Sequence, residues 1–166
     1  MTWNICVGAL CAGVTGALVF DLWNWIVERA IGIRAPRWAI LGRWLLHPFE
    51  PAPPSMGPAA VSFTTVEQIL GMSAHYVTAI AFALALILTT GSAWLATPTV
   101  LPAIFAGLIT TSFAWFIIMP LLGAGVAGAR IPHPNRHRVA TLISHAVMGL
   151  GFYVGAAATH MNGVFQ

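Results

Sequence analysis

Four long runs of apolar residues dominate the pattern of hydrophobic and polar positions along this chain. They cover about residues 5–27, 68–90, 100–122 and 139–159, and none of them contains arginine or lysine. Each is about 20 residues long, which is the length that an α-helix needs to cross roughly 30 Å of hydrocarbon. We therefore predict an all-α polytopic membrane protein, a four-transmembrane-helix bundle that forms a single domain over residues 1–166.

The distribution of basic residues predicts how the bundle is oriented. All seven basic residues are arginines, and they lie in the first connection, about residues 28–67, or in the third, about 123–138. Four spans place these two connections on the same side of the membrane. Because cytoplasmic connections carry an excess of arginine and lysine, we expect both connections to be cytoplasmic and both termini to lie on the periplasmic or external side.

The first connection carries a helical pattern of its own. Pro36 suits the first turn of a helix, and from there Trp38, Leu41 and Leu45 fall on one face. This pattern predicts a helix over about residues 36–46 that lies in the membrane interface, since the apolar stretch is too short to span the bilayer. The prolines that follow exclude further regular structure.

Composition and motifs exclude several classes of protein. With 58% hydrophobic and 7% charged residues, the chain falls far short of the roughly 25% charged residues of a soluble domain. No basic stripe lies on a soluble face, so we expect no nucleic-acid partner. Cys6 and Cys11 point about 140° apart on a helix and are interpreted as packing residues. The sequence has no CxxCH, HExxH or GxSxG motif, so we assign no covalent haem, catalytic residue or metal site.

Three ionisable residues inside the apolar runs are the main candidates for a functional site, because such groups are costly in hydrocarbon. Asp21 lies about six residues from the cytoplasmic end of its run, His75 about seven and His145 about six. These offsets place all three roughly 9–11 Å from the same membrane face. We expect the three side chains to converge inside one protomer.

The residues around the histidines allow several uses of this polar site. Gly71 and Gly149 each lie four residues from a histidine, on the same helical face, and are expected to leave room for something bulky. Two histidines on facing helices can ligate a haem iron axially, with Asp21 orienting one imidazole, so haem b is one candidate cofactor. A quinone, a proton or a small polar substrate is another. Alternatively, the three residues only hydrogen-bond one another and stabilise the bundle.

Charged residues near the cytoplasmic membrane face are further candidates for functional contacts. Those expected to be partners or gates of the polar site are Glu67, Arg43 and Arg130. Those expected to contact anionic lipid head groups are Arg34, Arg37, Arg136 and Arg138. The second expectation follows because basic clusters at the cytoplasmic end of a span attract such lipids.

Several short motifs, taken in order, resemble those of a known family. They are Asp21-Leu-Trp23, Gly42-Arg43-Trp44, Ala74-His75-Tyr76, Pro120-x-x-Gly123-x-Gly125, Arg130-x-Pro132-x-Pro134, Ser144-His145 and Gly149-x-Gly151-x-Tyr153. Over nearly its whole length the chain resembles a family of small bacterial four-span integral-membrane proteins classed as a domain of unknown function. The resemblance implies a bacterial inner membrane and four spans, and it implies no activity.

Three functions remain in view, and an enzyme is not the favoured one. We expect a binding or redox-accessory role for the Asp/His site. The alternative is an accessory or structural subunit of a larger membrane complex, which would need its small-residue stripes to face outward. A small-solute transporter that acts as a homo-oligomer is third, because four helices enclose little volume. Lipids are expected partners in every case.

Overall fold

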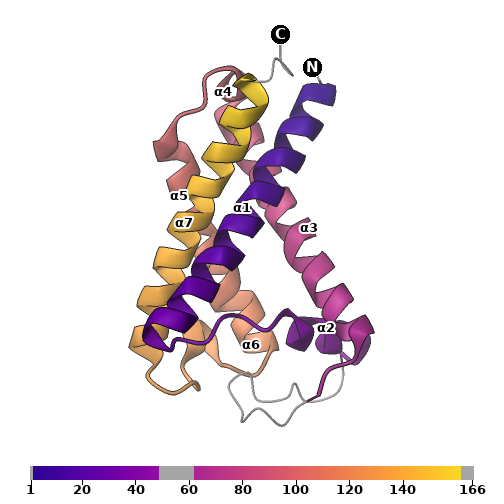
Figure 1. Ribbon diagram of the computed structural model, residues 1–166, viewed down its shortest axis with the longest axis vertical. Helices are drawn as coiled ribbons and strands as arrows, with labels where there is room; N and C mark the ends of the chain where they lie inside the picture. Colours follow the sequence, from indigo (N-terminus) through magenta and orange to yellow (C-terminus); the bar gives the residue numbers. More distant parts are fainter. Residues whose placement is uncertain (1, 49–61, 162–166) are drawn as a thin grey trace.

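The chain folds into a bundle of long helices with short helices at both ends (Figure 1). This is a computed structural model, and it describes residues 2–48 and 62–161. Three of the long helices are α1 (Thr2–Ile31), α3 (Thr65–Thr90) and α7 (Pro134–Met161). The other long segment is α5 (Val100–Phe113), continued by the π-helix η1 (Ala114–Ile118) and by α6 (Met119–Leu121).

The predicted fold class is confirmed. Within the described residues, four helical segments are long and apolar enough to cross a membrane. Three of the long helices, α1, α3 and α7, extend beyond the predicted apolar runs, because polar residues continue the helix there. At the start of α3, the hydroxyl of Thr64 accepts a hydrogen bond from the amide of Glu67 at 3.2 Å. The carboxylate of Glu67 in turn accepts one from the amide of Thr64 at 2.7 Å. This reciprocal cap fixes where α3 begins.

The shorter helices are α2 (Trp38–Leu46), α4 (Ala93–Ala96) and the 3₁₀ turn η2 (Val126–Gly128). In Figure 1, α1 begins and α7 ends at the end of the bundle that carries α4, whereas α2 and α6 lie at the opposite end. The arginine-rich connections therefore share one end. Residues 49–61, which include most of the proline-rich stretch, lie outside the described residues.

The predicted short helix of the first connection exists, but it begins later than expected. Arg37 caps α2 with an extended backbone (φ −97°, ψ 95°), and the first helical turn forms when Ile40 donates to the carbonyl of Arg37 at 3.0 Å. Pro36 thus precedes the helix instead of opening it, because the extended residue at Arg37 interrupts the helical backbone. Ile40 and Gly42 are the buried residues of α2.

Small residues hold the long helices close together. A Cβ atom added to Gly13 of α1 would overlap the backbone of Ile80 in α3. One added to Gly155 of α7 would lie 2.6 Å from the carbonyl of Cys11, again on α1. The small-residue stripes therefore form contacts within the bundle, as membrane helices use them to bring backbones together.

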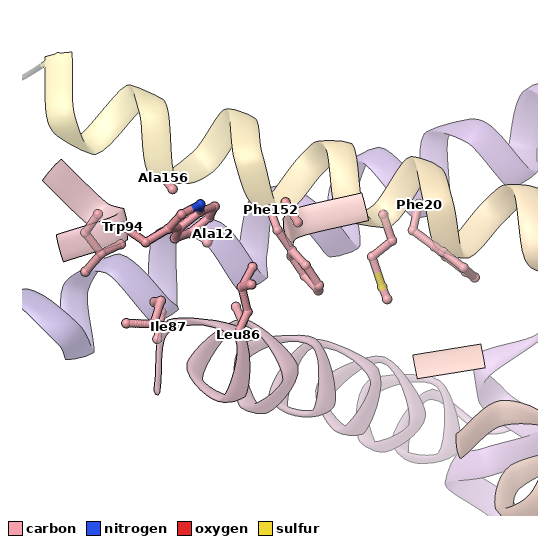
Figure 2. Close-up of a cluster of buried hydrophobic side chains, with 12 residues drawn as sticks. Ala12, Phe20, Leu86, Ile87, Trp94, Phe152 and Ala156 are labelled. Atoms are coloured by element: carbon pink, nitrogen blue, oxygen red, sulfur yellow. The ribbon is translucent and has the colours of Figure 1, made fainter. Parts of the chain in front are cut away.

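The apolar core runs lengthwise between α1, α3 and α7. Figure 2 shows Trp94 and Ile87 towards one end of this cluster, Phe152 in the middle and Phe20 towards the other end. Phe152 and Ile87 are almost completely buried. The outer faces of the long helices instead carry exposed apolar side chains such as Phe105 and Ile109, as expected for a protein whose solvent is lipid.

Candidate functional site

Two glycines seat α2 against α3 beside the candidate site. A Cβ atom at Gly42 would overlap the carbonyl of Glu67, and one at Gly71 would overlap the carbonyl of Trp38. The expectation that Gly71 leaves room for a bulky group is wrong, because the backbone of α2 fills that space. Gly149 behaves in the same way, since a Cβ there would overlap the carbonyl of Ala103 in α5. Both glycines bring helices together.

This seating places Trp38 of α2 over His75 of α3. The indole and imidazole rings are stacked, with centroids 3.8 Å apart and planes inclined by 12°. The indole Nε1 also donates a hydrogen bond to Oδ1 of Asp21 at 3.1 Å. Trp38 therefore links the first connection to two of the three predicted site residues.

Asp21 and His75 also approach each other directly. Nε2 of His75 lies 3.3 Å from Oδ1 of Asp21, yet this contact lacks the geometry of a hydrogen bond. His75 is 8% exposed, whereas the side chain of Asp21 is 28% exposed. Asp21 thus lies at the edge of the bundle, where it accepts a hydrogen bond from Trp38 and lies close to the imidazole of His75.

The third predicted residue, His145, is held from α5. Its Nδ1 lies 2.8 Å from the hydroxyl of Thr110, and that hydroxyl also donates to the carbonyl of Gly107 at 2.6 Å. Because the hydroxyl proton is directed to Gly107, the 2.8 Å contact is consistent with an Nδ1–H of His145 that donates to Thr110. His145 is buried, with 8% of its surface exposed.

Phe20 joins the two histidines. Its ring centroid lies 5.6 Å from that of His75 and 5.4 Å from that of His145, with an edge-on arrangement in the second case. The centroids of the two imidazole rings can therefore be no further apart than the sum of these two distances, about 11 Å. The structure brings Asp21, His75 and His145 into one neighbourhood, bridged by an aromatic side chain.

The three residues lie at matched positions along their helices. Asp21 is ten residues from the end of α1, His75 ten from the start of α3 and His145 eleven from the start of α7. These offsets correspond to about 15 Å along each helix. This length is counted from the helix ends, which extend past the apolar runs, whereas the expected distance of roughly 9–11 Å was counted from the membrane face.

Two cavities adjoin this neighbourhood. The larger, of about 200 Å³, reaches from Phe20 and His145 to the first connection at Arg34 and Arg37. The smaller, of about 90 Å³, is lined by both histidines and by Thr110. The residues that line both cavities are Phe20, Trp38, Leu41, Ala114, Ile118 and His145. His145 is therefore the predicted residue most directly placed to meet a bound molecule.

Polar groups on the wall of the larger cavity come from α1 and α7. Ser144 donates to Oδ1 of Asn24 at 3.0 Å, and Nδ2 of Asn24 donates to the carbonyl of Phe20 at 2.8 Å. Both residues line the larger cavity. Sequence reasoning missed them together with Thr110, although uncharged polar residues inside an apolar run are themselves a signal of inward-facing positions.

The π-helix η1 shapes the wall that the two cavities share. Ala114 and Ile118, its first and last residues, line both cavities. Pro120 follows directly and has no amide hydrogen, so it cannot complete the α-helical hydrogen bond to the carbonyl of Phe116. A wider turn before a proline relieves this mismatch, and such turns recur at functional sites.

Arg43 and Glu67 form a separate ion pair that links α2 to α3. Two guanidinium nitrogens contact the two carboxylate oxygens, and Nη2 also donates to the carbonyl of Ser62 at 2.7 Å. Glu67 is buried at the start of α3. The ion pair therefore stabilises the contact between α2 and α3. Neither of its residues lines the two cavities described above.

The remaining arginine candidates take different positions. Arg136 donates to the carbonyl of Ile31, and Arg138 donates to the carbonyl of Ala127 at 3.0 Å. Arg130 is exposed in the third connection. The residues of this group that line the larger cavity are Arg34 and Arg37.

A porphyrin does not fit between the two imidazoles. The cavity that both histidines line holds about 90 Å³, well below the roughly 300 Å³ at which ligand cavities for larger molecules begin. Phe20 packs against both rings, and Trp38 covers one face of His75. Within the described residues, no group of three or more His, Cys, Asp or Glu side chains is placed to hold a metal ion.

A family model described as "Protein of unknown function (DUF2938)" matches residues 10–159. No curated protein and no solved structure matches the chain.

Proposed function

The chain belongs to this family of unknown function (DUF2938), and from that premise we propose that it binds a small single-ring, membrane-soluble molecule of the quinone type. The binding site is the larger cavity, next to His145. We further propose that the protein resides in a bacterial inner membrane with its arginine-rich end in the cytoplasm. The role is one of binding, or of assisting a redox partner, and it requires no catalytic residue.

One observation carries the proposal: an apolar cavity of about 200 Å³ lies between the long helices and the first connection and has a few polar groups on its wall. A dry apolar cavity of about 150 Å³ accommodates benzene, so this volume suits one substituted ring. Predominantly apolar walls with a few placed polar groups are typical of small-molecule sites.

The side chains on the wall suit a flat ring with polar substituents. Phe20 and Trp38 supply aromatic surfaces, which pack well against another ring. The hydroxyl of Thr110 fixes the orientation of His145 through Nδ1. Ser144 donates to Asn24 on the same wall, and the amide nitrogen of Asn24 carries two N–H donors, of the kind that a quinone carbonyl accepts.

The use of small residues favours ligand binding over the role of an accessory subunit. An accessory subunit would present its glycine stripes to a partner. Here Gly13, Gly16, Gly151 and Gly155 face other helices of the same chain, as added Cβ atoms would collide with those neighbours. The packing energy that glycines provide in membranes is thus already used inside the bundle.

Filling the cavity tests the proposal. Ala140 lines the larger cavity, so Ala140→Phe should occupy it, whereas Ala85→Phe on an exposed part of α3 is the matched control. The probe is tetramethylbenzoquinone, added to protein purified in an uncharged detergent. It should raise the thermal midpoint of the wild type and of Ala85→Phe, because a ligand stabilises the state that binds it. It should leave that of Ala140→Phe unchanged. Equal effects on all three proteins would contradict the proposal.

A further inference from the structure

The larger cavity carries positive charge at the end near the first connection. Arg34 and Arg37 line it there, and both residues are exposed. His137 of α7 lines the same cavity. Among the described residues, none that lines this cavity is acidic. The wall therefore changes from aromatic and apolar inside the bundle to cationic at one end.

Three further arginines at this end of the bundle, Arg43, Arg136 and Arg138, do not line this cavity. Arg43 pairs with Glu67 between α2 and α3. Arg136 and Arg138 donate to backbone carbonyls of Ile31 and Ala127. Among the four arginines expected to contact lipid, which are Arg34, Arg37, Arg136 and Arg138, those that line the cavity are Arg34 and Arg37.

We propose that the ligand is an aromatic carboxylate: its ring occupies the cavity beside Phe20 and its carboxylate lies at Arg34 and Arg37. This inference rests on the proposed binding of a single-ring molecule of the quinone type, and it adds that the ring carries a carboxylate. A guanidinium presents a planar fork of N–H donors that matches a carboxylate. One carboxylate adds little volume to a ring, so the ligand still suits a cavity of about 200 Å³.

The position of the charge makes such binding favourable. Removing a carboxylate from water is unfavourable unless the charge is well paired. Because Arg34 and Arg37 are exposed, the acid group retains part of its hydration while two cations attract it. The ring, which loses little on leaving water, takes the buried part of the site. A long acyl chain would exceed the volume of the cavity, which favours a ring over a fatty acid or phospholipid.

A matched pair of probes tests the inference. Para-methylbenzoate and para-methylbenzamide have nearly the same shape and differ in charge. Binding is measured by titration calorimetry on the full chain in an uncharged detergent at low ionic strength. The double variant Arg34→Gln/Arg37→Gln removes both cations, and Arg29→Gln is the control, because Arg29 packs over Trp25 and does not line the cavity. Thermal midpoints show whether each variant is folded.

We expect the benzoate to bind the wild type and Arg29→Gln with equal affinity, and the double glutamine variant about tenfold or more weakly. Arg34→Lys/Arg37→Lys should recover part of the affinity, and salt should weaken binding to the wild type. The benzamide should bind more weakly and equally to all variants. Equal binding of benzoate and benzamide to the wild type, or unchanged benzoate binding by the folded glutamine variant, would overturn the inference.

The two proposals fail in different ways. If tetramethylbenzoquinone binds the wild type but the benzoate does not, the carboxylate is wrong and the single-ring site stands. If neither probe binds the wild type, the proposed single-ring site is wrong, and the effect of Ala140→Phe on binding cannot be observed. The carboxylate inference is then wrong as well.

Discussion

The indole ring of Trp38 lies face to face with the imidazole ring of His75, with centroids 3.8 Å apart. The same indole donates a hydrogen bond to Asp21. A residue of the short helix α2 thus completes a cluster whose other members lie on α1 and α3. The connection between the first two spans is part of the candidate site.

Trp38 should therefore contribute to stability in two separable ways. Trp38→Phe keeps an aromatic ring over His75 and loses the hydrogen bond to Asp21, which in a membrane protein is worth about 0.6 kcal/mol. Trp38→Ala loses the ring contact as well and should cost about 2 kcal/mol or more. Thermal unfolding in detergent, followed by circular dichroism, should give the order wild type, Phe, Ala. Trp3→Phe, at an exposed position, should match the wild type.

The opposite result would be informative. If Trp38→Ala unfolds at the same temperature as Trp3→Phe, α2 does not pack against the bundle in solution. The stacking on His75 would then have no energetic weight.

Much of the architecture follows from the sequence because its cause is local. About 20 consecutive apolar residues can be satisfied in lipid only as a helix, so the four spans are apparent without any tertiary information. The grouping of Asp21, His75 and His145 follows from their matched distances from the same end of the bundle and from the cost of exposing each to lipid.

Other features depend on tertiary packing, and the sequence pattern does not reveal them. The sequence pattern predicts that Trp38 belongs to an apolar face in the membrane interface. In the structure, Trp38 and Leu41 line cavities in the protein, whereas Leu45 is exposed. Gly71 was interpreted as free space, but a backbone from a distant segment fills it. Helical periodicity describes one helix at a time, so it does not specify which neighbour occupies a face.

The contact between Gly42 and Gly71 gives the next prediction. Gly42→Ala or Gly71→Ala would place a methyl group against a backbone carbonyl, which cannot move as a side-chain end can. Each should destabilise the protein by about 1–3 kcal/mol. Gly8→Ala should destabilise the protein less. Its Cβ would lie 2.8 Å from the end of the Leu95 side chain, which can move more easily than a backbone carbonyl. Denaturant titration of the three variants measures the difference.

Equal stability of all three alanine variants would contradict the tight crossing of α2 and α3. The result would mean that the two helices are further apart than the glycine contacts require.

The orientation of the bundle gives a prediction that is independent of the site. In a background with Cys6 and Cys11 replaced by alanine, single cysteines are introduced at Ser92 and Ala129, both exposed in short connections at opposite ends. Because the arginines cluster at the end that carries Ala129, a membrane-impermeant maleimide added to intact cells should label Ser92→Cys. The same reagent should label Ala129→Cys only after the membrane has been permeabilised. The reverse pattern would place the candidate site in the external half.

The shared contact with Phe20 predicts that the two histidines act as a coupled pair. Both imidazoles pack on that ring and line the same small cavity. His75→Ala removes the ring beneath Trp38, and His145→Ala removes the partner of Thr110. After either substitution, Phe20 and its neighbours can relax into the vacated space. The second substitution then removes fewer packing contacts than it would in the wild type. The double variant should lose less stability than the sum of the singles, with a coupling energy of about 0.5 kcal/mol or more.

A second cycle supplies the control for this coupling. Thr159 is buried on α7, fourteen residues beyond His145, which corresponds to about 21 Å along the helix. His145→Ala and Thr159→Ala should therefore be additive within about 0.5 kcal/mol, because changes this far apart share no partners. The same cycles apply to the binding of tetramethylbenzoquinone: His145→Ala removes a wall of the larger cavity directly, whereas His75→Ala acts only through Phe20 and Trp38. Strict additivity of the two histidine substitutions in both stability and binding would show that the residues are neighbours without forming one site.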